Sequence, residues 1–448
     1  MARSPSPVAT PPAGAEKAGT ARVRWLKPDW PFTFLFLGFP IWWALGLGSM
    51  IHPVFAVFMA FQLLQRRSVR LPRGIGLWCL YIVWVFGSAI GLSQGTPIAY
   101  IWRLLMYLSI TVIFVWIYNA PRDVLPTAKV LKVLITLFFI VLAGGWLGVL
   151  LPGGGFTSAA EILLPANLIE NPFVRDLIHP AFAQVQDFLG YPVGRPKAPF
   201  VYTNDWGSVY ALLCPLFFAV WLQDPRKRFK GYAILGASLV PVFLSLNRGL
   251  WLSLGVALLY AGTRQGPLGS FARKSLATLA ILGITLLVFT PLSTVVEDRA
   301  SHGHSNEGRA YLYEETVKAV RHSPIIGYGG PLPAAKSRIL PAIGTQGQLW
   351  NVMISQGLVG TLLFGGFLLR MTWATRRGPP VTFWAHVVLI VGIVQLPIYD
   401  MMPTPLHLIF VVAALGLREL HDPHPAGAAR TPDQAATPDA RLVSMVHA

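Results

Sequence analysis

Apolar stretches long enough, or nearly long enough, to cross a lipid bilayer recur throughout the 448-residue chain. A transmembrane helix needs about 20 mostly apolar residues. Such stretches occur twelve times, at approximately 31–48, 51–65, 74–93, 97–118, 128–151, 204–222, 232–246, 250–263, 276–292, 347–369, 381–398 and 405–418. Only 12% of the residues are charged, far fewer than in a typical soluble protein. The sequence therefore predicts an all-α, polytopic integral membrane protein with about 12 transmembrane helices. Some stretches are short enough for a re-entrant segment to be an alternative.

Polar segments divide the chain into three predicted parts. Residues 1–29 and 421–448 are polar tails rich in Ala and Pro, and we expect both to be disordered. The first tail has no apolar core, so we expect no signal peptide. Residues 30–420 form the predicted transmembrane domain. Two long connections, at about 152–203 and 293–346, are expected on the extracytoplasmic side, and connections of this length usually carry function.

The net charge of +17 has a simple explanation in a membrane protein. With the N-terminus placed in the cytoplasm, most of the 36 Lys and Arg residues fall on the cytoplasmic side of the predicted helices. This distribution follows the positive-inside rule. It predicts a multi-pass protein of the cytoplasmic membrane with both termini inside. It also removes the reason to expect a nucleic-acid partner, whereas membrane lipids are expected partners.

One arginine breaks this pattern, because Arg248 lies at the predicted outer boundary between the stretches 232–246 and 250–263. It is either a snorkelling anchor or a ligand for an anion. The flanking Asn247 and Gly249 predict a tight turn with backbone donors that suit an anion. Further basic residues are expected near the same surface: Arg103, Arg195, Lys197 and Arg309. Guanidinium groups bind phosphate in a fork geometry, so a lipid diphosphate is a reasonable ligand, as is an anionic lipid headgroup.

Four segments, in order, resemble the O-antigen ligase family, which includes related O-antigen polymerases. They are 195-RPKAPFVYTNDWG-207, with Asn204 at the family's Asn position; 245-SLNRG-249; 308-GRAYLY-313 followed by 322-HSPIIGYG-329; and 345-TQGQLWNVMISQGLVG-360. Together they cover about residues 195–365. The earlier stretches are similar to the family only in their topology.

The resemblance implies a multi-helix membrane fold of GT-C-like architecture and an inverting, metal-independent glycosyltransferase without a cofactor. Such an enzyme takes a glycan from undecaprenyl diphosphate on the outer face and joins it to an acceptor hydroxyl on a glycan or a lipid. Carried over by position, Arg248 and Arg309 would hold the diphosphate and offset the charge of the leaving group. Arg103, Arg195, Lys197, Asn204 and Asn247 are the further substrate-binding residues we expect.

The chain departs from the family at Gln346, where the family has a histidine that is the proposed general base. A glutamine cannot accept a proton at neutral pH. It could orient a sugar hydroxyl or a phosphate oxygen instead, so we keep Gln346 as a site residue with an open role. Other histidines and carboxylates lie on the outer segments, and each has a more ordinary structural interpretation: His302, His304, Glu314, Glu315, Asp205 and His322.

Three classes of function remain compatible with the sequence: a glycan ligase or polymerase, a transporter or flippase, and a non-catalytic binding protein. A ligase attaches a finished chain to a different acceptor, whereas a polymerase uses a second lipid-linked glycan. A transporter or flippase should place charges on several membrane segments, and Arg103 is the one evident intramembrane charge here. A non-catalytic protein that binds lipid-linked glycans is the third alternative, because Gln346 replaces the family histidine.

Overall fold

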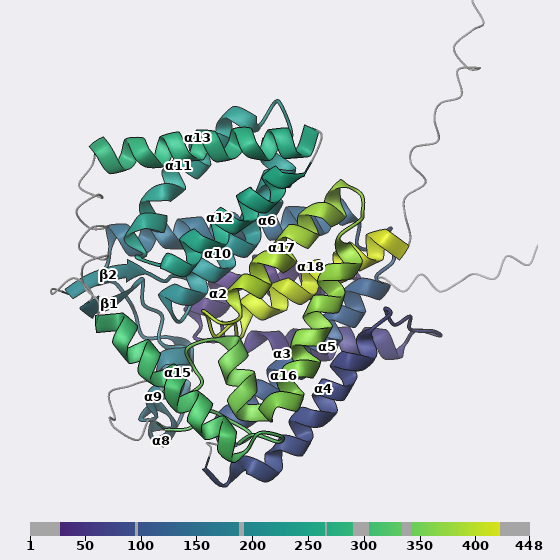
Figure 1. Cartoon of the computed structure of the whole chain (residues 1–448), viewed down its shortest axis with the longest axis vertical. Helices are drawn as coiled ribbons and strands as arrows, with labels where there is room; N and C mark the ends of the chain where they lie inside the picture. The colour runs from purple at the N-terminus through teal and green to yellow at the C-terminus, as the bar shows by residue number, and fades with distance from the viewer. Residues whose placement is uncertain are drawn as a thin grey trace, which may run out of the picture.

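The computed structural model describes residues 27–94, 97–187, 192–264, 267–289, 304–333 and 342–421. The described part is mostly helical (Figure 1). Its N-terminal half contains α1 (Trp30–Leu37), α2 (Phe39–Ala44), α3 (Ile51–Leu64), α4 (Ile75–Gly87) with the 3-10 helix η1 (Ser88–Gln94), α5 (Pro97–Asn119) and α6 (Thr127–Leu150). The connection that follows holds α7 (Ala159–Leu163), α8 (Ala166–Ile169), α9 (Pro172–Ile178), β1 (Ala183–Asp187) and β2 (Pro192–Pro196).

The C-terminal half contains α10 (Thr203–Phe217) with the π-helix η2 (Phe218–Leu222), α11 (Arg228–Leu244), α12 (Arg248–Thr263), α13 (Pro267–Phe289), α15 (His304–His322), α16 (Gln348–Thr375), α17 (Pro380–Gln395) and α18 (Thr404–His421). Helices therefore overlap each of the twelve predicted stretches. The first stretch forms two short helices, because the chain turns at Gly38 between α1 and α2.

Among the described residues, five helical segments are long and apolar enough to cross a membrane: Ile75–Leu92, Pro97–Asn119, Thr127–Leu150, Thr203–Leu222 and Gln348–Thr375. The helices α3 and α17 are apolar but shorter. The described part of the chain is therefore that of a multi-pass membrane protein.

The all-α prediction misses one small sheet. Strands β1 and β2 pair antiparallel, with Ala183 opposite Pro196 and Asp187 opposite Pro192. The two prolines of β2 cannot donate a backbone hydrogen bond, which is why this segment does not read as a strand in the sequence. In Figure 1 the hairpin lies at the left, with α9 and α15 below it, while α18 runs away from them to the right.

The core of the bundle is built around α18. Every residue of α18 from Thr404 to Glu419 is buried, as expected for a helix surrounded by other helices. Aromatic side chains fill the contact with its neighbours: Phe410 lies 4.5 Å from Trp78 of α4 and 5.4 Å from Phe367 of α16, measured between ring centroids. This packing fixes α4, α16 and α18 against one another.

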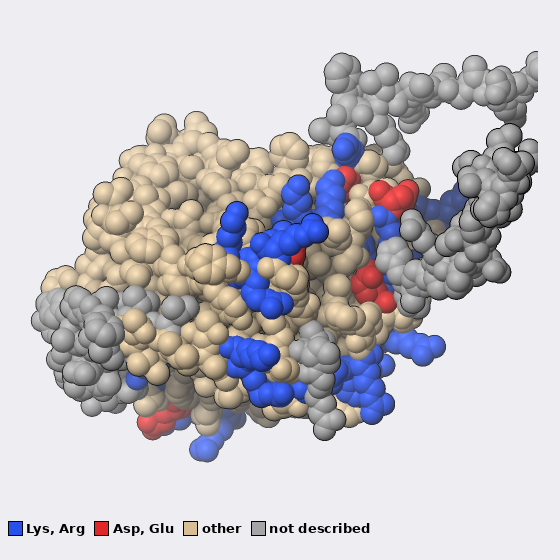
Figure 2. Space-filling view, turned by 90° about the horizontal axis from the view of Figure 1, so that it is seen from above, with Lys and Arg blue, Asp and Glu red and all other residues tan. Residues whose placement is uncertain are grey.

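Helices α11 and α12 run in opposite directions, so the turn that joins them and the segments at their far ends lie on opposite sides of the bundle. The far ends carry basic clusters at residues 226–230 and 264–274. Figure 2 shows that basic side chains gather on the right half of one face, while the uncovered left half is largely uncharged.

Helix α16 is interrupted at Gly357, whose φ of 66° and ψ of −169° are not helical. Residues with positive φ favour glycine. The break opens the helix to the turn after α15: Leu358 N donates to Pro324 O at 2.7 Å, and Tyr328 N donates to Ile354 O at 2.9 Å. Trp84 Nε1 also donates to Gln356 O at 2.8 Å. Backbone groups released by a break in a membrane helix need such partners.

Candidate functional site

The turn between α11 and α12 is held by the side chain of Asn247, which is buried. Its Oδ1 accepts a hydrogen bond from Leu250 N at 3.3 Å and caps the N-terminus of α12. The same oxygen accepts from the Tyr399 hydroxyl, and Asn247 Nδ2 donates to Thr203 O at 3.4 Å. A Cβ on Gly249 would overlap the Tyr399 hydroxyl. The sequence motif around Asn247 thus forms a close junction between three segments.

Arg195 supports this turn from the hairpin. The side chain is buried, with 6% exposed. Its Nε donates to Ser245 O and its Nη1 donates to Gln186 Oε1, both at 2.6 Å. We predicted Arg195 as a substrate ligand, and the structure gives its guanidinium these two protein partners. Arg195 therefore joins β2 to the end of α11.

The two arginines predicted to bind the diphosphate lie on different helices. Arg248 is the first residue of α12, directly after the Asn247 cap, and it is exposed. Arg309 lies in the second turn of α15 and is half-buried. Burial raises the pKa of the Tyr399 hydroxyl, and the charges of Arg309 and Arg195 act on the same hydroxyl to lower it. The charge of Arg309 thus acts on Tyr399, which contacts the Asn247 turn directly.

Lys197 and Asn204 flank the entry into α10, and both are half-buried. Burial lowers the pKa of Lys197, while the charges of Asp176 and Asp205 raise it. Tyr202 donates to Asp176 Oδ2 at 2.9 Å. Lys197 therefore lies in a mixed environment with carboxylates beside it, less positive than the sequence alone predicts.

Arg103 has a partner that the sequence does not reveal. Its Nη2 lies 3.5 Å from Oδ2 of Asp400, in the turn between α17 and α18. Asn351 Nδ2 donates to the same oxygen at 3.3 Å. Burial raises the pKa of Asp400, and the charge of Arg103 lowers it. No local motif marks Asp400, which meets Arg103 only because α18 packs beside α5.

Gln346 is buried and makes hydrogen bonds with both ends of its amide. Its Oε1 accepts from Gly344 N at 2.9 Å. Its Nε2 donates to Leu312 O at 3.2 Å and to Thr316 Oγ1 at 2.9 Å. These contacts tie the segment before α16 to α15, the helix that carries Arg309.

The other candidate bases have ordinary surroundings where they are described. Lys318 pairs with Glu314 at 2.7 Å and with Glu315 at 3.1 Å. His322 Nδ1 lies 2.9 Å from Lys318 O. Asp205 accepts from Tyr202 N at 3.3 Å in the first turn of α10, which supports the helix-capping interpretation. His302 lies outside the described residues, and the side chain of His304 also lies outside them.

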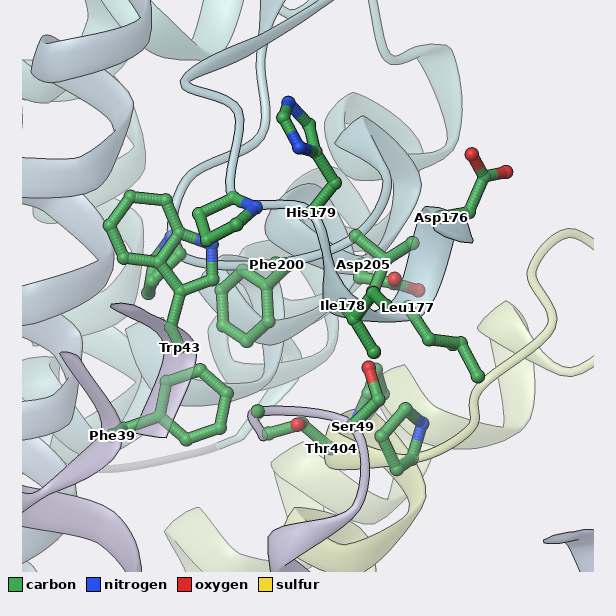
Figure 3. A pocket seen from close by; sticks show the side chains of 16 residues that line it. Phe39, Trp43, Ser49, Asp176, Leu177, Ile178, His179, Phe200, Asp205 and Thr404 are labelled. Atoms are coloured by element: carbon green, nitrogen blue, oxygen red, sulfur yellow. The ribbon is translucent and has the colours of Figure 1, made fainter. Parts of the chain in front are cut away.

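A small pocket, with a cavity volume of about 20 Å³, opens beside the first turn of α10. Figure 3 shows Phe39, Trp43 and Phe200 on one side of it, and Ser49, Thr404 and Asp205 on the other. The 152–203 connection also carries aromatic residues, among them Phe156, Phe173, Phe182, Phe188 and Tyr191. Of these, Phe156 and Phe182 pack against Trp43 with ring centroids 5.7 and 6.1 Å apart, Phe173 packs against Trp102 at 5.8 Å, and Phe188 and Tyr191 lie outside the described residues.

No group of three or more His, Cys, Asp or Glu in the described ranges is placed to hold a metal ion. Five of the predicted site residues fall into two neighbouring groups, the second of which adds residues that were not predicted. One surrounds Asn247 and includes Arg195, Arg248 and Arg309. The other surrounds Asp400 and includes Arg103 and Asn351, and Tyr399 joins the two because it precedes Asp400 and contacts Asn247.

Comparison with known proteins finds a family similarity in one region of the chain. Residues 201–374 match the family model described as O-antigen ligase. No curated protein matches the chain significantly. The matched region runs from the entry of α10 through α16 and includes Asn247, Arg248, Arg309 and Gln346, whereas Arg103, Arg195 and Asp400 lie outside it. The resemblance seen in the sequence is confirmed over this region: residues 201–374 of this polytopic membrane protein are O-antigen ligase-like.

Proposed function

We propose that the protein is a glycosyltransferase of the cytoplasmic membrane that acts on its outer face. It moves a glycan from undecaprenyl diphosphate to an acceptor hydroxyl and serves as a ligase or polymerase of cell-surface polysaccharide. In this proposal the reaction inverts the anomeric centre and is metal-independent, as the family resemblance implies. The donor is a lipid-linked glycan, which suits a protein of this family embedded in membrane lipids.

The arginines around the Asn247 turn carry the proposal. Arg248 is exposed at the first residue of α12, where the helix dipole adds positive potential. Arg309 lies on α15, and its charge acts on Tyr399, the residue that contacts the same turn. Guanidinium groups bind phosphate oxygens in a fork geometry and remain charged at all physiological pH values. The two side chains suit the diphosphate of the donor.

In the proposed mechanism, the arginines act by position and charge. The acceptor hydroxyl attacks the anomeric carbon while the bond from that carbon to the diphosphate oxygen breaks. Negative charge develops on the departing diphosphate, and Arg248 and Arg309 stabilise it. A preorganised, charged hydrogen-bond donor such as an arginine side chain typically raises the reaction rate by a factor of about 10² to 10³. Lys197 and Asn204 contact the glycan near the entry of α10, and Gln346 orients α15.

The membrane arrangement belongs to the same proposal. The basic segments at residues 226–230 and 264–274 lie at the helix ends opposite Asn247. The positive-inside rule places them in the cytoplasm and the Asn247 turn outside. Both termini then lie in the cytoplasm, with tails at 1–29 and 421–448. We also propose that all twelve apolar stretches cross the membrane, in a GT-C-like arrangement.

A non-catalytic binder of lipid-linked glycans is the second candidate. It is favoured by one observation, because the amide of Gln346 is occupied by contacts to Gly344, Leu312 and Thr316. A transporter or flippase is the third alternative. The ion pair of Arg103 with Asp400 is compatible with each of these, so a functional assay has to separate them.

The test is transfer in proteoliposomes that contain undecaprenyl-diphosphate glycan extracted from the envelope of the source organism. Released undecaprenyl diphosphate is measured for the wild-type protein, for Arg248→Ala and for Arg226→Ala, an exposed control at the opposite helix end. We expect release that Arg248→Ala reduces at least 100-fold and Arg226→Ala leaves unchanged. Product length then separates a polymerase from a ligase. Binding of the lipid without release would establish a binder, and movement of intact lipid between leaflets would establish a flippase.

A further inference from the structure

The ion pair between Arg103 and Asp400 is only half made. An arginine can offer Nε and Nη2 along one edge to both oxygens of a carboxylate. Here Nη2 lies 3.5 Å from Oδ2. Arg103 Nε and Asp400 Oδ1 are both buried, and neither has a hydrogen-bond partner among the described residues. One donor and one acceptor of the same pair are therefore left for a third group.

The surroundings hold this pair in place. Arg103 is 6% exposed, so its guanidinium cannot turn freely to solvent. Asn351 Nδ2 donates a hydrogen bond to Asp400 Oδ2. Gln348, one helical turn earlier in α16, donates from Nε2 to the Tyr107 hydroxyl at 3.1 Å. Gln348 Oε1 accepts from Met401 N at 3.2 Å, which fixes the residue after Asp400. Buried polar atoms in such a fixed network normally have partners, so the two orphaned atoms point to a polar ligand group.

The Asp400 side chain can be reached from outside the protein, because 27% of it is exposed. It also adjoins the arginine site: Tyr399 precedes it and donates to Asn247, the residue before Arg248. A hydroxyl group has the chemistry that matches the two unpartnered atoms, since its oxygen can accept from Arg103 Nε and its hydrogen can be donated to Asp400. A fully ionised phosphate or carboxylate has no hydrogen to donate to Asp400.

We propose that Asp400 is the proton acceptor for the acceptor hydroxyl, and that Arg103 holds that hydroxyl against it. This inference rests on the proposed glycan transfer. Asp400 takes the role that the family assigns to a histidine at the position of Gln346, whose amide is occupied by three protein contacts. The substrate group at this site is thus an alcohol of a sugar or a lipid-linked sugar.

The step balances without any further reactant. The acceptor oxygen forms a bond to the anomeric carbon as the bond from that carbon to the diphosphate oxygen breaks. The hydroxyl proton passes to the Asp400 carboxylate. The electron pair of the broken bond leaves with undecaprenyl diphosphate, and Asp400 later releases its proton to water. Arg103 remains charged throughout.

The experiment compares Asp400→Asn, Asp400→Glu and the wild-type protein in the same proteoliposome assay. Glu170→Gln, which removes an exposed carboxylate from the outer connection, is the matched control. Binding of undecaprenyl diphosphate alone is measured in parallel. The rate is recorded against pH, because a base works only when deprotonated. Other groups that act near Asp400 are Arg103 and Tyr107 from α5, and Tyr202 and Asp205 at the start of α10.

We expect Asp400→Asn to lower the transfer rate by about 10²- to 10⁴-fold, with undecaprenyl diphosphate binding unchanged. Asp400→Glu should restore part of the rate and keep the fall in rate at acidic pH, which Asp400→Asn should lose. If the Asp400→Asn variant transfers glycan at the wild-type rate and with the wild-type pH profile, the assignment of Asp400 as the proton acceptor is overturned. Loss of lipid binding in both Asp400 variants would also overturn it, in favour of a structural role. Absence of transfer by the wild-type protein counts against the proposed function itself.

Discussion

The turn at Asn247 and the turn at Asp400 meet at one hydrogen bond but present their charges differently. The first joins α11 to α12 in three residues and places Arg248 on the surface. The second joins α17 to α18 through residues 396–403 and holds Asp400 against a buried arginine. An exposed cation suits a ligand with strong negative charge. A partly exposed carboxylate paired with a buried arginine suits a neutral hydroxyl, which can donate a hydrogen bond to it.

The two turns also differ in their similarity to known proteins. The Asn247 turn lies inside the region that matches the family, whereas the Asp400 turn lies outside it. If the two turns form one site, damage to either should impair transfer, while damage to their junction should impair both. The following changes test this, beginning with the largest expected effect.

Arg309→Ala should lower the rate of transfer by about 10²- to 10³-fold, because it removes a charge that stabilises the leaving diphosphate. Arg309→Lys should recover only part of the rate, since lysine lacks the fork of donors. The control is Arg321→Ala, an exposed arginine in the last turn of the same helix. Equal activity in the two alanine variants, at matched protein levels, would remove Arg309 from the site.

Gly249→Ala should separate the two turns. The added Cβ would overlap the Tyr399 hydroxyl and lie 2.7 Å from Ile398 Cγ2. Forced overlap in a packed interior costs about 1–3 kcal/mol. The thermal unfolding temperature in detergent and the transfer rate should both fall. Gly255→Ala in the same helix has open space around the new Cβ and should change neither. Indistinguishable behaviour of the two variants would show that the junction is not tight.

Gln346→His restores the residue of the family, and we expect transfer to fall rather than rise. Imidazole cannot reproduce an acceptor for Gly344 N together with two donated bonds to Leu312 and Thr316. A buried polar group left unsatisfied costs about 1–3 kcal/mol. The measurement is the transfer rate together with hydrogen exchange of α15. A rate above that of the wild-type protein would return the base to position 346 and oppose the role of Asp400.

Tyr399→Phe should have the smallest effect. It removes the hydrogen bond to Asn247 Oδ1, which keeps its bond from Leu250 N. We expect a loss of about 1 kcal/mol in unfolding free energy and a transfer rate reduced about fivefold. Tyr260→Phe, which removes a 2.7 Å contact to His386 near the other end of α12, is the control. A similar loss of stability without a change in rate in both variants would mean that the junction serves folding alone.

The sequence predicts the helical segments well because apolar length is a local property. It also predicts the arginine turn, since 245-SLNRG-249 is a continuous motif. It does not predict the contact of Asn247 with Tyr399, which joins residues 152 positions apart. Asp400 is invisible for the same reason, because a single acid near the end of an apolar stretch has many explanations. The prolines of β2 conceal the hairpin, and the substitution at Gln346 does not reveal that its amide holds α15.

The interruption of α16 has a consequence for how the protein is made. The turn at residues 324–328 supplies the partners of the backbone groups that the break at Gly357 releases. That turn is synthesised about 30 residues before Gly357, so the hydrogen-bond partners of the interrupted helix exist before the interruption itself is made. In the proposed topology the turn must first be exported across the membrane. Helix α16 then inserts into the bilayer with its interruption, and the exported turn folds back to bind the backbone groups at Gly357.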